Sequence, residues 1–129
     1  GAIMSAGHTP GPWGEKYRTS FNGENYFDGV VGPDGGQIRV EGLTLSSGAE
    51  ARANARLIAA APDLLAACET FAEWLRREDA GPRYPQGTDR DSAGNEAIWR
   101  EWYDGNLALC SAAQDQALAA IARATGAVK

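Results

Sequence analysis

The chain has 129 residues, enough to bury a core, and we expect residues 1–129 to form one domain. Its 17 acidic and 12 basic side chains give a net charge of −5, which disfavours a protein that holds duplex DNA by neutralising phosphates. We expect no signal peptide and, because no run of about 18 apolar residues occurs, no membrane partner. Residues 1–3 precede Met4 and are expected to be a remnant of an expression tag.

Residues 13–45 mix aromatic and β-branched residues with glycines, a pattern typical of a short antiparallel sheet. We predict strands over residues 13–19, 26–31 and 37–45. The segments Asn22-Gly23 and Gly32-Pro-Asp-Gly-Gly36 are predicted to be the connecting turns, because proline presets φ and glycine accepts positive φ. A sheet this small needs a helix or a second subunit to cover its apolar face.

A first long helix is predicted over residues 47–79. Ser47-Gly-Ala-Glu50 fits a capping box, in which the serine and glutamate side chains satisfy backbone donors of the first turn. Pro62 lies inside this helix, and we expect either a kink there or two abutting helices, because proline removes a backbone donor. Downstream apolar residues recur every three or four positions and should share one face: Leu57, Ala61, Leu64, Cys68, Phe71 and Leu75.

A second long helix is predicted over residues 95–124, after a loop over residues 80–94 that begins with Gly81-Pro82. Its apolar surface is wide, because two neighbouring stripes follow helical spacing. One stripe contains Trp99, Trp102, Asn106, Leu109, Ala113, Ala117, Ala120 and Ala124, and the other contains Tyr103, Leu107, Cys110, Leu118 and Ile121.

The fold class that follows is α+β, with a small N-terminal antiparallel sheet and two long antiparallel α-helices that form a helical hairpin. A helix of about 30 residues spans about 45 Å, more than three short strands can cover, so the hairpin should project from the sheet. One stripe of the second helix packs against its partner helix. We hypothesise that a second copy of the chain covers the other stripe, which gives a dimer or larger homo-oligomer formed through the helices.

The sequence lacks the common motifs of enzymes, such as GxSxG, GxxxxGK[ST] and HExxH. We therefore expect no catalytic residues, no metal site and no cofactor. His8 is expected to be a surface or packing residue. Cys68 and Cys110 are expected to be buried, reduced thiols, as in a cytoplasmic protein.

Arg52, Asn54 and Arg56 are candidate ligand-binding residues. The two arginines lie four residues apart near a helix N-terminus, where the helix dipole opposes a positive charge. Either an acidic neighbour such as Glu50 offsets this cost, or the phosphate of a ligand does so, held by the guanidinium groups and the helix-terminal amides.

A second group of candidate ligand-binding residues surrounds the loop between the long helices. Arginines grip phosphates and aromatic planes stack on bases, which are the contacts that a nucleotide pocket needs. The alternative is that the aromatic residues belong to the core and that the local carboxylates neutralise the arginines. The candidates are Arg83, Tyr84, Arg90, Asn95, Trp99, Arg100 and Tyr103.

Two motifs of the chain, His8-Thr-Pro-Gly-Pro-Trp13 and Asn54-Ala-Arg-Leu-Ile-Ala-Ala-Ala-Pro-Asp-Leu-Leu65, resemble those of a widespread family of small phage and prophage proteins. In the order of its elements, the chain is also similar to the phage anti-Thoeris family. Proteins of that family are oligomers that sequester cyclic ADP-ribose isomers, and some hold cyclic oligonucleotides, without degrading them.

These resemblances imply a phage anti-defence protein in the cytoplasm of an infected bacterium. Our leading hypothesis is a non-enzymatic homo-oligomer that binds a cyclic nucleotide immune signal and sequesters it. The alternative is an inhibitor that acts by direct contact with a bacterial defence complex, as anti-CRISPR proteins do, with its acidic surface as a nucleic-acid mimic.

Overall fold

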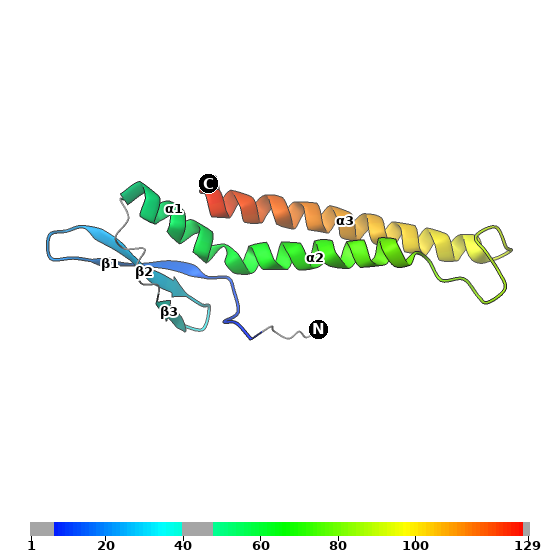
Figure 1. Cartoon of the computed structure of the whole chain (residues 1–129), viewed down its shortest axis with the longest axis horizontal. Coiled ribbons are helices and arrows are strands. Elements are labelled where there is room, and N and C mark those ends of the chain that lie inside the picture. Colours follow the sequence, from blue (N-terminus) through cyan, green and yellow to red (C-terminus); the bar gives the residue numbers. More distant parts are fainter. Residues whose placement is uncertain (1–6, 40–47, 128–129) are drawn as a thin grey trace. The chain divides into compact units, whose positions relative to one another are not determined.

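The computed structural model describes residues 7–39 and 48–127 (Figure 1). The fold is α+β, as predicted, with a three-stranded antiparallel sheet followed by helices. The chain divides into two structural units. The sheet unit comprises residues 1–65 and 118–129, and the helix-pair unit comprises residues 66–117.

The sheet contains β1 (Gly14–Thr19), β2 (Asn25–Val31) and β3 (Gln37–Arg39) in the order β1-β2-β3. Both predicted turns are confirmed, with Gly23 at φ +86° and Gly35 at φ +89°. The first two strands lie within one residue of their predicted bounds. The third was predicted over residues 37–45, and its part beyond residue 39 lies outside the described residues.

A β-bulge interrupts the pairing of β1 with β2, because Lys16 pairs with Gly29 whereas Tyr17 pairs with Phe27. Gly29 has φ +150°, and a Cβ atom built on it would lie 2.0 Å from the carbonyl oxygen of Ile38 in β3. Only glycine allows this close approach between neighbouring strands.

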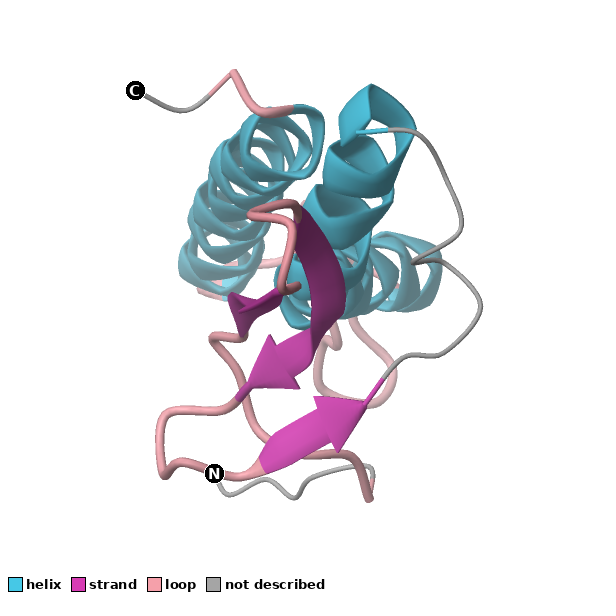
Figure 2. Ribbon diagram, turned by 90° about the vertical axis from the view of Figure 1, so that its left-hand side faces the viewer, coloured by secondary structure: helices cyan, strands magenta, loops and turns pink. Residues whose placement is uncertain are grey.

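Helix α1 (Gly48–Ala59) packs on β1 and β2 (Figure 2). Small residues at helical spacing bring the helix close to the sheet, and Ala55 and Ala59 form the core together with Phe27 and Val30 of β2. A helix of the same chain therefore covers one face of the sheet. Of the predicted capping box, Ser47 lies outside the described residues.

Of the two alternatives predicted at Pro62, a kink or two abutting helices, the structure has two helices, so the predicted fold of two long helices is corrected. Helix α2 (Ala61–Ala80) follows α1 after Ala60 alone, and the chain has three helices rather than two in its described part. The break lies where Pro62 has no N–H to donate to the carbonyl of Ile58. The flanking bonds persist, since Ala60 N donates to Arg56 O and Leu64 N donates to Ala60 O.

Helix α3 (Asn95–Thr125) and the loop of residues 81–94 lie within one residue of their predicted bounds. In the helix-pair unit, α2 and α3 run antiparallel, since Thr70 bonds Gln116 while the later residue Arg77 bonds the earlier residue Asn106. All residues of the first stripe predicted on α3 are buried or half-buried. Within the helix-pair unit, Asn106 and Ala113 are the least exposed residues of this stripe.

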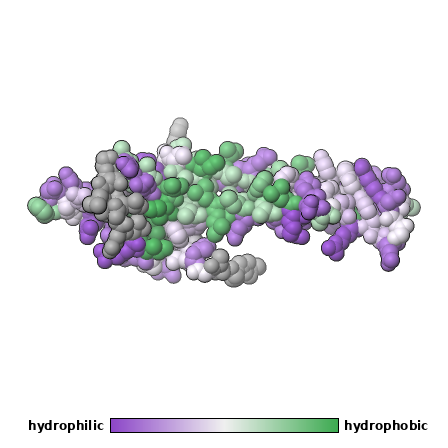
Figure 3. Space-filling model, viewed as in Figure 1, coloured by the Kyte–Doolittle hydropathy of each residue, from purple (hydrophilic) through white to green (hydrophobic). Residues whose placement is uncertain are grey.

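The predicted apolar face of the first long helix is corrected in two ways. Leu57 belongs to α1, and the remaining members except the half-buried Leu64 are exposed rather than buried, with Phe71 and Leu75 about half exposed. Cys68 is exposed and Cys110 is half-buried, so the expected burial of both thiols is wrong, although both are free. Figure 3 shows hydrophobic residues gathered on the surface of the helix pair and hydrophilic ones toward the 81–94 loop.

The two motifs that carry the family resemblance meet in the sheet unit. A Cβ atom built on Gly11 would lie 2.7 Å from Cβ of Pro62, so the two segments are in direct contact. Arg123 of α3 donates to Asp63 Oδ2 at 2.5 Å and to the carbonyl oxygen of Trp13. The two motifs and the end of α3 are therefore joined by direct contacts within the sheet unit.

No helix within residues 7–39 and 48–127 is both long enough and apolar enough to cross a membrane.

Candidate functional site

The loop of residues 81–94 and the start of α3 hold most of the candidate residues. Asn95 is 3% exposed, and its amide nitrogen donates to Thr88 Oγ1 at 2.9 Å and to the carbonyl oxygen of Asp89 at 2.5 Å. Ser92 and Asp89 are linked by further hydrogen bonds. Asn95 thus fixes the loop against the first turn of α3 and leaves contacts with a ligand to its neighbours.

A pocket of about 450 Å³ lies at this N-terminus of α3, and we call it the α3 pocket. The Cζ atom of Arg90 lies 4.5 Å from the ring centroid of Trp99, and Trp99 is stacked on Tyr103 at 5.0 Å with an angle of 15° between the planes. The lining residues are Arg90, Asp91, Ser92, Ala93, Gly94, Glu96, Trp99 and Arg100.

The α3 pocket is lined by two arginines, Arg90 and Arg100, and by two carboxylates, Asp91 and Glu96, so an anionic ligand would compete with carboxylates for the guanidinium groups. Arg100 forms an ion pair with Glu96 at 3.3 Å, four residues earlier on the same exposed helix face. The first turn of a helix carries N–H groups without intrahelical acceptors and the positive end of the helix dipole, both of which favour an anion. Displacing Glu96 would free the Arg100 guanidinium for a ligand.

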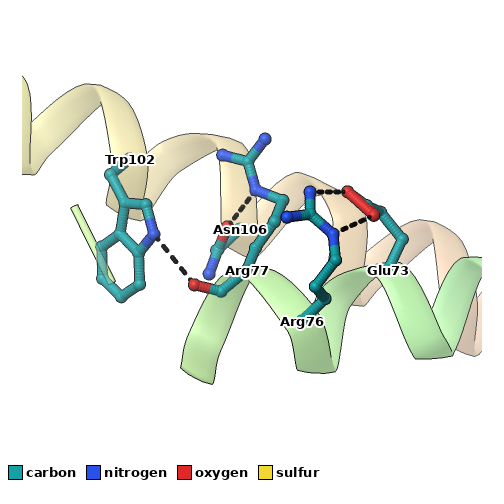
Figure 4. Close-up of polar contacts among 5 residues, drawn as sticks. All are labelled: Glu73, Arg76, Arg77, Trp102 and Asn106. Atoms are coloured by element: carbon teal, nitrogen blue, oxygen red, sulfur yellow. Dashed lines mark hydrogen bonds and ion pairs between the residues drawn. The ribbon is translucent and has the colours of Figure 1, made fainter. Parts of the chain in front are cut away.

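A second groove, of about 310 Å³, lies between α2 and α3 and contains Arg76, Arg77 and the candidate Arg83. Arg76 binds both carboxylate oxygens of Glu73, and this contact lowers the pKa of Glu73 and raises the pKa of Arg76. Arg77 Nε donates to Asn106 Oδ1 at 2.6 Å, and Trp102 Nε1 donates to the Arg77 carbonyl oxygen (Figure 4). Arg76 and Arg77 therefore already have partners, whereas Arg83 is exposed.

Asn106 is oriented by this contact. Because a guanidinium can only donate, its Oδ1 must face Arg77, which leaves Nδ2 on the other side. This nitrogen is buried and has no hydrogen-bond partner among the described residues. Asn106 also lines a small groove of about 210 Å³ on the opposite side of the helix pair, with Trp74, Tyr103 and Leu107.

The candidates Arg52, Asn54 and Arg56 lie on α1 in the sheet unit. A Cβ atom built on Gly126 would lie 2.8 Å from Arg56 Nε, so Arg56 sits against the C-terminal end of α3, where a positive charge is favoured. Burial and a hydrogen bond to Glu15 raise the pKa of Tyr17 to about 12, while the charges of Arg52 and Arg56 oppose this shift.

The structure thus groups four of the predicted ligand-binding residues, with Arg90, Trp99 and Arg100 lining one pocket and Tyr103 stacked beside it. Arg83 lines a different groove, and Tyr84 is half-buried in the loop. Sequence reasoning missed Asp91, Ser92 and Glu96 as lining residues. The spacing of Glu96 and Arg100 by four positions within one helix was the available signal.

A family model described as Salmonella phage P22 protein Y8K6 matches residues 4–128, nearly the whole chain. No curated protein and no solved structure matches the chain.

Proposed function

The chain belongs to the family of Salmonella phage P22 protein Y8K6, and on this premise we propose that it is an anti-defence protein that binds and sequesters a cyclic nucleotide immune signal. It acts in the cytoplasm of the infected bacterium and does not cleave the signal. The ligand occupies the α3 pocket, with its phosphates on Arg90 and Arg100 and a base near Trp99.

The observation that carries this proposal is the convergence of Arg90, Trp99 and Arg100 at a helix N-terminus. Guanidinium groups bind phosphate oxygens through paired hydrogen bonds. Tyr103 stacks on one face of Trp99 and Arg90 covers the other, so in the proposed complex Arg90 turns to the phosphate and a nucleobase takes its place on the ring. The volume of about 450 Å³ falls within the usual range of small-molecule sites, about 300–1,000 Å³.

Binding of this kind requires no nucleophile, general base, metal or cofactor, and the proposal assigns none. The ligand is held by ion pairs, hydrogen bonds and stacking alone. Sequestration then depends on affinity and on the amount of protein, since the signal leaves the free pool without any covalent change.

Calorimetric titration with cyclic ADP-ribose isomers and with cyclic di- and trinucleotides tests the proposal. We expect one of these probes to bind the native protein, and Arg90→Ala or Arg100→Ala to weaken that binding by about 10- to 100-fold, the usual effect of removing a charge-assisted hydrogen bond. Arg76→Ala is the matched control, because Arg76 lies outside the α3 pocket and pairs with Glu73. Absence of heat with every probe would refute the proposal.

Recovery of the ligand separates sequestration from cleavage. The protein is incubated with the probe that binds, then denatured by heat, and the released compound is identified by mass spectrometry. We expect the intact probe, whereas a hydrolysed product would show that the protein is an enzyme.

The excess of carboxylates in the helix-pair unit favours a second candidate function. Residues 66–117 contain ten acidic and five basic side chains, which suits direct contact with the nucleic-acid-binding surface of a bacterial defence complex. A pull-down from host lysate distinguishes the two functions. A protein that sequesters a nucleotide signal retains small molecules in the pull-down, whereas a direct inhibitor retains a host protein.

A further inference from the structure

The helix-pair unit exposes a continuous set of large hydrophobic side chains. Tyr103 and Leu107 of α3 are 45% and 58% exposed, and Phe71 and Leu75 of α2 are 50% and 47% exposed. We call these residues, together with the two cysteines of the unit, the apolar face: Cys68, Phe71, Leu75, Tyr103, Leu107 and Cys110.

The two helices contribute to the same side of the unit. Trp74 and Glu78 of α2 line one groove together with Tyr103, Leu107 and Cys110 of α3. Phe71 packs on Trp74, with their ring centroids 5.6 Å apart. The arginine groove of Arg76, Arg77 and Arg83 lies on the other side. The apolar face is therefore a single surface, separate from the charged groove.

The fully buried residues of the helix-pair unit are all small or polar: Ala67, Asn95, Asn106 and Ala113. Larger residues such as Trp74, Trp102 and Leu109 are only half-buried, and Thr70 donates a hydrogen bond to Gln116 across the pair. Burial of alanines contributes little hydrophobic free energy, because that energy scales with the apolar area removed from water. A helix pair that buries none of its large side chains fully, and leaves four of them about half exposed, favours a further apolar surface.

The spacing of the apolar face suits a helical partner. Its residues on α2 are separated by three and four positions, and those on α3 by four and three. Each helix thus carries two adjacent stripes of heptad-like spacing, one facing its partner within the chain and one facing outward. This is the pattern of a helix in a four-helix bundle, where every helix has two neighbours.

The area and charge of the apolar face match a contact between copies. Side chains of this size bury about 150–250 Å² each, so four of them at half exposure leave roughly 400 Å². A standard interface needs about 800 Å² per partner, of which a little over half is apolar. None of the six residues is charged, and Glu78, which lines the groove beside them, is a carboxylate that each copy would bring to the edge of the contact.

We propose that a second copy of this chain covers the apolar face, so that two helix pairs form a four-helix bundle related by a two-fold axis. The contact is isologous, with the same residues contributed by both copies. This proposal does not depend on the ligand, because the α3 pocket is lined from within one chain.

Sedimentation equilibrium of the full chain tests the proposal. We expect a species of twice the 13.6 kDa chain mass, and a shift to the monomer in Leu107→Glu, where a carboxylate would be buried in the contact. Ala108→Glu is the matched control, because Ala108 is exposed on another face of the same turn and should leave the dimer intact. A monomeric native protein, or a dimer that survives Leu107→Glu, would overturn the proposal.

The thiol of Cys68 gives a second readout that does not require a disruptive variant. Its rate of alkylation is measured in the native protein over a dilution series, with Cys110→Ser to isolate it. We expect alkylation to accelerate on dilution, as the apolar face becomes free. A rate that stays constant while the dimer dissociates would place the contact on another surface and refute the proposal.

Discussion

The two structural units solve the problem of hydrophobic burial differently. In the sheet unit, the large residues Phe27 and Val30 are 0% exposed and the small residues of α1 close over them, although this unit also exposes Leu57, Leu118 and Ile121. The helix-pair unit has no large side chain that is fully buried: its tryptophans are half-buried, and Phe71, Leu75, Tyr103 and Leu107 are about half exposed. We propose that a second copy of the chain covers these exposed residues. Both proposed contacts, with ligand and with a second copy, belong to the second unit.

The largest expected effect tests the completeness of the sheet unit. Phe27→Ala should destabilise the protein by about 3–5 kcal/mol, because it opens a cavity in a fully buried core. Urea unfolding followed by the fluorescence of Trp13, the sheet unit's own tryptophan, measures the loss. Phe21→Ala is the control, since Phe21 is fully exposed and its removal should leave stability unchanged. Equal effects would contradict the assignment of the core.

A second prediction concerns the close approach of β2 and β3. Gly29→Ala should cost about 2–4 kcal/mol, because the new Cβ meets the Ile38 carbonyl oxygen in a backbone conformation that strains alanine. Gly23→Ala, at another positive φ but with open space around it, should cost only about 1 kcal/mol. Thermal unfolding of both variants compares them, and a smaller loss for Gly29→Ala would disprove the steric account.

Arginine contacts sharpen the comparison further. Arg123→Met should cost about 1–2 kcal/mol, because Asp63 and the Trp13 carbonyl lose a partly buried donor. Arg76→Met in the helix-pair unit removes an equally short ion pair on the surface, and we expect no measurable change in the urea midpoint. Comparable losses would mean that burial does not distinguish the two contacts.

Truncation of the apolar face should have an effect that depends on concentration. Phe71→Ala removes a half-exposed ring, so we expect a loss of no more than about 1 kcal/mol in dilute protein. At concentrations where copies associate, the loss should grow, because the ring is then buried. Thermal melts over a dilution series measure both, and a concentration-independent loss would count against the second copy.

The smallest effect is the pH dependence of Tyr17. Its pKa is raised to about 12, so the folded state favours the neutral phenol over the phenolate. The resulting stability is present below pH 10, the ordinary pKa of tyrosine, and is lost as the pH rises through about 12. A hydrogen bond to Glu24 also raises the pKa of Tyr26, so absorbance titration should show more than one late-titrating phenol, of which the one near pH 12 disappears in Tyr17→Phe. Its persistence would assign the high pKa to another residue.

Most strand and helix bounds could be predicted from short-range sequence patterns. Gly23 and Gly35 fix the turns, and Gly81-Pro82 directly follows the end of α2. Periodicity grouped Cys68, Phe71 and Leu75 on one face. It could not show that this face is outside, because spacing identifies which residues share a face but not what packs against it. At Pro62 the sequence could not decide between a kinked helix and two separate helices.

The candidate site was predicted in part. The residue types pointed to the loop, and Arg90, Trp99 and Arg100 do line one pocket. The sequence could not show that the Asn95 side chain donates its hydrogen bonds to the loop, or that Arg56 lies at the end of α3. Both contacts join residues that come together only when the chain folds.

Hydrogen–deuterium exchange measured over a range of protein concentrations tests the contrast between the two units most directly. Amides that are buried by association exchange more slowly as the protein becomes more concentrated. We predict that exchange in residues 66–80 and 95–117 slows with concentration, while exchange in β2 and α1 stays constant. Equal, concentration-independent protection in both units would contradict the claim that the helix pair is completed by a second copy.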